Sequence, residues 1–293
     1  MEYEIKPCGE QESAYIEERF WAESSLAIHE DAEVAQRVFK VTDETGSILG
    51  GCVLEVDLCK IAEFNSLWVA EGHRRRGIAT ALILAAEEAA RESGCTVIVN
   101  NFCFDFNHAG QLFEGLGYLR CGVTEGWPRG HEAYYYQKRL DTHPANALFP
   151  PIGTDYEVQL GSQEDDERIA QALEAYNTAV VPRTHPYLSL DRKLVDEAGA
   201  IVGGCIWGVS GWDTAHIDLL WTEPFAHAQG ISLLAEIEKE ALAHGAGLVL
   251  TDAAGAQADY FREQGYRVTA AHDYGKRTDT LAKELILNSH RNL

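Results

Sequence analysis

The chain has 293 residues, of which 46% are hydrophobic and 24% charged, an ordinary composition for a globular protein of one large or two modest domains. Disordered and fibrous chains are excluded, and a formal net charge of −22 disfavours nucleic acid and anionic membranes as partners while favouring small cations. No run reaches the roughly 18 apolar residues of a membrane helix, and the N-terminus lacks a basic region followed by an apolar core, so we expect a cytoplasmic protein.

The first half of the chain alternates between strand and helix patterns. A hairpin is predicted at the turn residues 43–46, and the order strand, helix, strand after residue 61 predicts a parallel pair with a right-handed crossover. The predicted elements, in chain order, are a strand at 2–6, a helix at 11–23, strands at 37–42, 48–56 and 61–69, a helix at 80–93, a strand at 96–101 and a short helix at 109–115.

The second half repeats the first. Asp43–Cys52 reads DETGSILGGC and Asp196–Cys205 reads DEAGAIVGGC, with seven of ten positions identical at an offset of 153. The same offset carries Leu67-Trp68 onto Leu220-Trp221, while the later Gly117-Tyr118 matches Gly265-Tyr266 at an offset of 148. The chain is therefore two copies of one domain.

The boundary between the copies is expected at 141–154, where prolines and a glycine break regular structure. This predicts a domain at 1–140, a linker at 141–154 and a second domain at 155–293. The predicted fold class is mixed α/β, with each domain a twisted mixed sheet flanked by helices.

A glycine-containing basic run opens the predicted helix after the strand at 61–69. Arg74, Arg75 and Arg76 precede Gly77, and the uncapped N–H groups at a helix N-terminus attract anions. Gly77 and Ala79 leave room for a phosphate to approach the backbone. The alternative is a solvated basic run that merely precedes a helix.

The order of these elements resembles the GNAT superfamily of acyl-CoA-dependent N-acyltransferases, whose signature is [Q/R]-x-x-G-x-[G/A]. Arg74, Gly77 and Ala79 match that signature, and residues 107–113 followed by Gly117-Tyr118 are similar to the family's later asparagine, short helix and G-[F/Y] motif. The resemblance covers nearly all of residues 1–140 and, through the duplication, 155–287. It implies two tandem GNAT domains.

The resemblance implies that acetyl-CoA is the co-substrate. The strand at 61–69 would splay from its neighbour and offer backbone groups to the pantetheine arm, and the following loop would hold the pyrophosphate. The residues it assigns to this cofactor are Leu67, Trp68, Val69, Arg74, Arg75, Arg76, Gly77, Ile78, Ala79, Thr80, Asn107 and Phe113.

Glu63 is the candidate catalytic base. Its spacing before Val69 and Arg74 is similar to that of the histone-acetyltransferase branch, in which a glutamate there removes the proton through water. Its apolar neighbours on the strand are expected to raise its pKa toward neutrality. The alternative is a glutamate on a solvated strand face.

The general acid is left open. Many family members place a tyrosine four residues before the motif glycine, where this chain has Phe113. Water, His108 or Tyr118 would then have to protonate the leaving thiolate, with Tyr118 better suited to the core.

The second copy departs further from the signature. It has His227 for the arginine, Gly230 for the glycine, Ser232 for the small residue, Phe261 for the tyrosine and His216 for Glu63. We expect the first copy to be catalytic and the second to have a structural or substrate-shaping role.

Trp21, Trp127 and His131 are candidate substrate-site residues, although aromatic residues on helices and strands are more often core. Seven scattered cysteines without a C-x-x-C pair indicate neither a disulfide framework nor a metal site.

The leading hypothesis is an N-acetyltransferase acting on a small, cationic amine, as a monomer or homodimer. The alternatives are a protein or peptide N-acetyltransferase and a non-catalytic acyl-CoA binder or scaffold.

Overall fold

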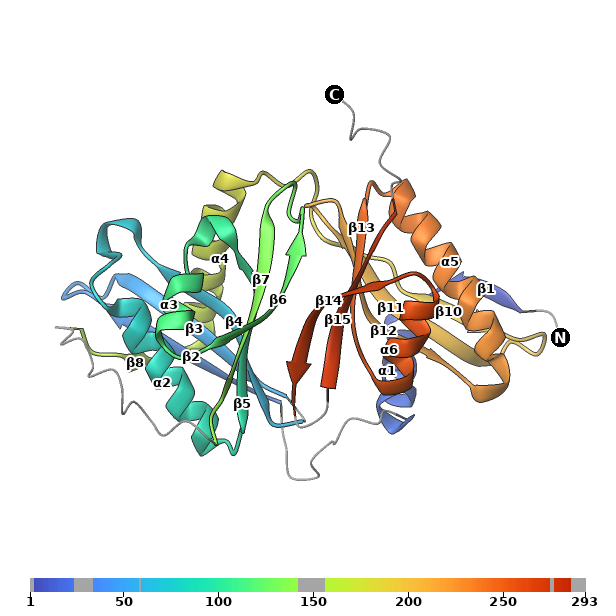
Figure 1. Ribbon diagram of the computed structural model, residues 1–293, viewed down its shortest axis with the longest axis horizontal. Coiled ribbons are helices and arrows are strands. Elements are labelled where there is room, and N and C mark those ends of the chain that lie inside the picture. The colour runs from blue at the N-terminus through green and yellow to red at the C-terminus, as the bar shows by residue number, and fades with distance from the viewer. Residues whose placement is uncertain (1–2, 24–33, 58, 142–155, 275–276, 286–293) are drawn as a thin grey trace. The chain divides into compact units, whose positions relative to one another are not determined.

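The computed structural model describes residues 3–23, 34–57, 59–141, 156–274 and 277–285, which form two compact units (Figure 1). The Arg74 unit comprises Ala27–Glu125 and His131–Pro182. The His227 unit comprises Met1–Leu26, Gly126–Gly130 and Arg183–Leu293. Each unit has a mixed sheet and helices, so the predicted α/β class is confirmed.

The sheet of the Arg74 unit is antiparallel except for the parallel pair β4 and β5, which the sequence predicted. In spatial order its strands are β6 (Leu119–Glu125), β7 (Glu132–Arg139), β5 (Val97–Phe104), β4 (Ile61–Val69), β3 (Ile48–Val56), β2 (Ala35–Thr42) and β8 (Gln159–Leu160). Its helices are η1 (Glu71–His73), α2 (Ile78–Glu92), η2 (Asp105–Asn107), α3 (Gly110–Gly115) and α4 (Gln163–Val180).

The His227 unit repeats this order, with β12 and β13 as its parallel pair. In spatial order its strands are β1 (Glu4–Pro7), β10 (Arg192–Val195), β11 (Ile201–Ser210), β12 (Thr214–Thr222), β13 (Leu248–Ala254), β15 (Arg277–Glu284) and β14 (Arg267–Asp273), with β9 (Leu188–Ser189) on β11. Its helices are α1 (Glu10–Glu23), η3 (Pro224–Ala226), α5 (His227–Ala243) and α6 (Gly255–Glu263).

The two repeats exchange their first strand and helix. β1 pairs with β10 and α1 packs on β10, β11 and β12, whereas β8 pairs with β2 and α4 packs on β2, β3 and β4. Figure 1 shows the exchange by colour, with blue α1 among the orange and red elements and yellow α4 beside the blue and green ones. The compact units therefore differ from the repeats at 1–140 and 155–293, and the expected linker lies, beyond Asp141, outside the described residues.

The double glycine shared by the repeats makes room for the exchanged helices. A Cβ on Gly51 would lie 2.1 Å from Cδ1 of Ile169 on α4, and a Cβ on Gly204 would lie 2.2 Å from Cδ1 of Ile16 on α1. Both isoleucines are fully buried. The exchanged helix therefore packs on the double glycine, which belongs to the stretch that is most similar between the repeats.

The start of each exchanged helix is fixed by an acid and a lysine. Asp165 accepts from the backbone N–H and the hydroxyl of Ser162 and pairs with Lys40 at 2.8 Å, and these partners, Lys40 first, lower the pKa of Asp165 to about 2. In the other unit, Glu12 accepts from the N–H of Gly9 and pairs with Lys193. Both lysines come from the other repeat.

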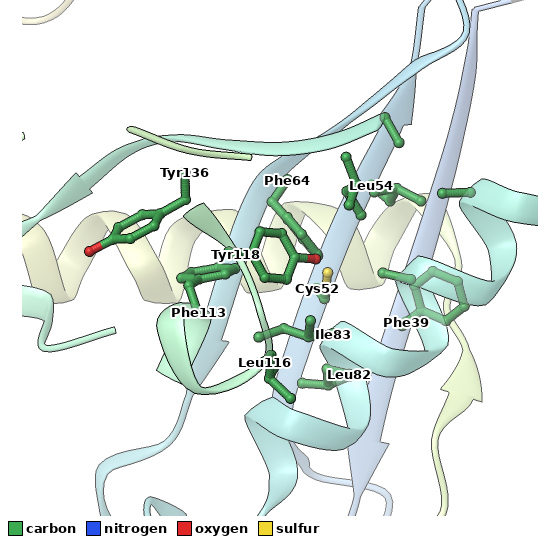
Figure 2. Close-up of a cluster of buried hydrophobic side chains, with 14 of the residues drawn as sticks. Phe39, Cys52, Leu54, Phe64, Leu82, Ile83, Phe113, Leu116, Tyr118 and Tyr136 are labelled. Atoms are coloured by element: carbon green, nitrogen blue, oxygen red, sulfur yellow. The ribbon is translucent and has the colours of Figure 1, made fainter. Parts of the chain in front are cut away.

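The main core of the Arg74 unit lies between its sheet and α2 and α3. Figure 2 shows Leu82 and Ile83 of α2 and Leu116 beyond α3 facing strand residues such as Leu54 and Phe64. Ile169 of α4 packs with Val53 and partly buried Trp68 in a separate cluster. The sheet is therefore covered on both faces, by α2 and α3 on one and by α4 on the other.

Candidate active site

β4 and β5 part midway along their length. Their parallel pairing runs from Ile61 opposite Val97 to Glu63 opposite Val99 and then stops, although both strands continue. A bulge at Asn65 shifts the register of β4 on β3 at the same level. The predicted splay of the strand that carries Leu67, Trp68 and Val69 is therefore present, and these three residues are partly exposed beside it.

Glu63 lies at the last pair before this opening. Its neighbours Ala62 and Phe64 are buried in the core cluster on the α2 side, so the alternation of the strand directs Glu63 to the face covered by α4. It is half-buried, and its Oε1 accepts a hydrogen bond of 2.9 Å from Nδ2 of Asn101 on β5. A carboxylate thus stands at the opening, on the side of the exchanged helix.

The run before α2 forms a loop with two left-handed residues. η1 ends at Arg74 in extended conformation, Arg75 has φ 62°, and Gly77, the N-cap of α2, has φ 84°. No side chain in the described ranges caps the first N–H groups of α2. Arg75 and Arg76 are exposed. Free N–H groups and two exposed cations together make an anion site at the end of β4.

The corresponding segment of the His227 unit is helical. η3 begins with Pro224 and runs directly into α5 at His227, which has helical backbone angles, so Gly230 lies within α5 and is buried. The preceding 3-10 turns start at equivalent residues, Glu71 and Pro224, so the two units differ in the four residues that follow the turn. Gly230, which aligns with Gly77, therefore differs from it in conformation, because no loop precedes it.

The side chain of Arg74 is fixed by two neighbours. Its Nε donates to the carbonyl of Val69 at 3.0 Å, and its guanidinium lies over the ring of Tyr176 on α4, 4.5 Å from the centroid. The hydroxyl of Tyr176 donates to the carbonyl of Phe106 at 3.2 Å. Tyr176 therefore ties the segment after β4 to the segment after β5, across the mouth of the opening.

A comparison with protein families identifies a domain in the first part of the chain. Residues 3–118 match the model of the Acetyltransferase (GNAT) family. The chain carries a GNAT acetyltransferase domain. The protein is thus an acyltransferase by family, and the family uses acetyl-CoA as donor. No curated protein matches the sequence.

Solved GNAT structures are similar to parts or all of the chain. An acetyltransferase from Bacillus cereus is 26% identical over 44% of this chain and 96% of its own, with a TM-score of 0.41. An acetyltransferase from Bacillus anthracis, in complex with acetyl coenzyme A, is 19% identical over 40% and 69%, with a TM-score of 0.33. A tandem GNAT protein from the clavulanic acid biosynthesis pathway is 16% identical over 98% and 99%, with a TM-score of 0.41.

The Arg74 unit has groups whose chemistry is compatible with acetyl-CoA. The uncapped N-terminus of α2 with Ile78, Ala79 and Thr80 suits the pyrophosphate, and the unpaired upper half of β4 offers backbone groups to the pantetheine arm. Arg74 is engaged with Val69 and Tyr176, so it would support the loop while Arg75 and Arg76 remain exposed for phosphate.

Phe113 and Asn107, the two later motif residues, have different surroundings. Phe113 is buried against Phe64 and Tyr118 and is stacked on Tyr136, so it is a core residue rather than a surface for the cofactor (Figure 2). Asn107 ends η2, and its buried Oδ1 has no hydrogen-bond donor among the described residues. The sequence assigned both to the cofactor, and the structure favours Asn107 alone.

Two acid candidates are also located. Burial raises the pKa of the Tyr118 hydroxyl well above its usual value, and the ring lies within the core, as expected. His108 is exposed at the end of η2 with φ 55°.

The three substrate-site candidates belong to different units. Trp21 lies on α1 in the His227 unit, and buried Trp127 in the same unit packs edge-on against His216 at 5.6 Å. His131 belongs to the Arg74 unit, where Nδ1 lies 2.9 Å from Oδ1 of Asp105 in η2. Trp21 was assigned to the wrong unit because the helix exchange leaves no mark in the sequence.

Two side chains beside the opening were not among the residues that the sequence predicted for the site. Tyr176 was missed because it comes from the second repeat. Asn101 was missed because it was treated as the end of a regular strand, although two asparagines in succession are poor strand formers and signal an irregularity.

Among the described helices, none is long and apolar enough to cross a membrane. Within the same residues no group of three histidine, cysteine, aspartate or glutamate side chains is arranged to hold a metal ion. The seven cysteines are free thiols.

Proposed function

We propose that the Arg74 unit transfers the acetyl group of acetyl-CoA to the primary amine of a small cationic molecule. The observation that carries the proposal is the placement of two groups around one opening: the uncapped N-terminus of α2 after β4, and Glu63 at the last β4–β5 pair. The first would bind the donor and the second would serve the acceptor. The net charge of −22 favours a cationic acceptor.

In this scheme Glu63 accepts a proton from the acceptor amine, directly or through water. The neutral amine then attacks the thioester carbonyl, and the tetrahedral intermediate loses the CoA thiolate together with the second proton of the attacking nitrogen. Phe113 has no proton to give and Tyr118 is buried, so water or His108 protonates the thiolate. Acetyl-CoA supplies the activated acyl group, and the protein supplies orientation and the base.

The second repeat would serve the first site rather than duplicate it. Burial lowers the pKa of His216 to about 4, so this counterpart of Glu63 is neutral at pH 7, and the loop before α5 is replaced by helix. The second repeat instead contributes α4 and Tyr176 to the Arg74 unit. This role is the substrate-shaping one that the sequence suggested.

The test is release of CoA thiol from acetyl-CoA in the presence of small amines, such as polyamines, aminoglycosides and amino acids, and separately of peptides. Turnover with small cations supports the proposal. Turnover with peptides alone would assign a protein or peptide acetyltransferase instead. Tight acetyl-CoA binding without turnover on either panel would make the protein an acyl-CoA binder.

A further inference from the structure

Asn101 is a side chain at the opening for which the acetyl-transfer scheme has no role. Its Nδ2 donates to Oε1 of Glu63 at 2.9 Å, from the strand that faces Glu63 across the point where β4 and β5 part. The donor is neutral, so it orients the carboxylate without adding a charge. A hydrogen bond from an amide stabilises the ionised form of a carboxylate more than the protonated form.

A bulge in β5 brings Asn101 to this position. The register of β5 on β7 is regular up to Asn100 opposite Tyr136 and resumes at Cys103 opposite Tyr134, so Asn101 and Phe102 together face one residue. Phe102 has φ 59°, a conformation that non-glycine residues rarely adopt, and its ring packs edge-on against Tyr135 at 5.5 Å. Bulges of this kind redirect side chains and are common beside active sites.

The His227 unit has no carboxylate at the position of Glu63 and no bulge. There β13 pairs with β15 in unbroken register from Leu248 to Ala254, and His216 occupies the position of Glu63. The strained backbone therefore occurs in the unit that has Glu63. This difference indicates that the bulge serves Glu63 rather than the fold, which is formed in both units.

We propose that Asn101 is a positioning residue for the base, with its amide holding the Glu63 carboxylate toward the acceptor amine and favouring its ionised form. The inference rests on the proposed function of Glu63 as the base. It adds a residue that acts through Glu63 and does not itself touch the acetyl group.

Charged and titratable groups lie on the elements that pack beside β4. Glu55 lies directly opposite on β3, and Asp105 with His131 follows β5. The last turns of α4 carry Glu174 and Tyr176, with Arg74 over the tyrosine ring. None of these groups changes in the variants below, so a difference in titration between variants reports on Asn101.

The experiment is an NMR titration of the Glu63 carboxyl in protein labelled with ¹³C-glutamate, the signal being assigned by its loss in Glu63→Gln. Asn101→Leu removes the donor and Asn101→Asp keeps the shape of the side chain while adding a like charge. Both should raise the pKa of Glu63, by about one pH unit or more for Asn101→Leu and at least as far for Asn101→Asp. The comparison variant is Asn65→Leu, which removes a hydrogen bond of 2.8 Å from an amide to Glu55 and should shift the Glu63 titration less than Asn101→Leu does.

An unchanged Glu63 titration in both Asn101 variants would overturn the proposal, as would an equal shift in Asn65→Leu. Asn101→Asp keeps the test decisive if the leucine variant does not fold. Turnover of Glu63→Gln is measured separately, so failure of Glu63 as base and failure of Asn101 to hold it give different results. In turnover, the rising limb of kcat/KM should move to higher pH in the Asn101 variants, since the base acts when ionised.

Discussion

The segments before α2 and α5 contain the same Gly-Ile pair in two different structures. In the Arg74 unit, Gly77 has φ 84° and ends an open loop, whereas Gly230 lies inside α5, which begins at His227. The strand order, the exchanged helices and the double glycines are alike in both units. A duplicated domain can therefore keep its fold while one short segment changes from loop to helix.

The largest difference between the units should appear in catalysis. Glu63→Gln removes the base and should lower turnover by about 10²- to 10⁴-fold, with acetyl-CoA binding retained. The matched change His216→Gln in the other unit should leave turnover near the wild-type value, because His216 is neutral at pH 7. Steady-state thiol release measures both. Equal losses in the two variants would contradict a single catalytic unit.

Each unit has a lysine–glutamate ion pair in its core, and removal of the carboxylate should lower the unfolding free energy more where the pair is more deeply buried. Lys138 Nζ donates to both carboxylate oxygens of fully buried Glu87 at 2.8 and 2.9 Å, so Glu87→Gln should cost about 3–5 kcal/mol of unfolding free energy. The pair of Lys283 with Glu238 in the other unit is more exposed, and Glu238→Gln should cost less.

Chemical denaturation with a fluorescence readout measures these losses. Glu88→Gln is the control on α2, because the Glu88 side chain is 61% exposed and its ion pair contributes about 1 kcal/mol or less. If Glu87→Gln proved as mild as this control, the buried pair would not be formed in solution.

The reciprocal helix exchange can be broken at its glycines. Gly51→Ala would clash with Ile169 and Gly204→Ala with Ile16, and each should cost about 1–3 kcal/mol. Combining Gly51→Ala with Ile169→Val should recover part of the loss, since the two sites are in contact. Gly115→Ala, which meets nothing within 4 Å, should be near neutral. A neutral Gly51→Ala would show that α4 does not pack there.

The smallest expected effect concerns Tyr176. Tyr176→Ala removes the ring beneath Arg74 and should weaken acetyl-CoA binding about 2- to 30-fold, from a cation–π contact of about 0.5–2 kcal/mol. Tyr176→Phe keeps the ring, loses the bond to Phe106, and should fall between the two. Calorimetric titration of acetyl-CoA distinguishes the three proteins. Unchanged affinity in Tyr176→Ala would show that the second repeat does not support the loop.

Much of the fold is readable from the sequence because it depends on local patterns. The turn at Asp43 forms as predicted, with the Asp43 carboxylate accepting from the N–H groups of Thr45 and Ser47, and Asp196 repeats this turn in the second copy. The parallel β4–β5 pair and the helix after the arginine run are also where the pattern places them.

The sequence does not show which of the two sheets each of the helices α1 and α4 packs on. The repeats are so alike that Ile16 fits either its own Gly51 or the Gly204 of the other copy, and the sequence does not distinguish these pairings. For that reason Trp21 was assigned to the wrong unit and Tyr176 was missed. The conformation of the two aligned glycines is also not readable, because Gly77 and Gly230 have the same Gly-Ile sequence but lie in a loop and in a helix.

Binding of acetyl-CoA to one unit and not the other can be measured by calorimetry of the intact chain. We expect one site per chain, lost in Ala79→Asp, where the new carboxylate would face the pyrophosphate while remaining favourable at a helix N-terminus. The matched Ser232→Asp, on the first turns of α5, should leave that site intact. Two sites per chain, or loss of binding in Ser232→Asp with retention in Ala79→Asp, would show that the Arg74 unit is not the single binding unit.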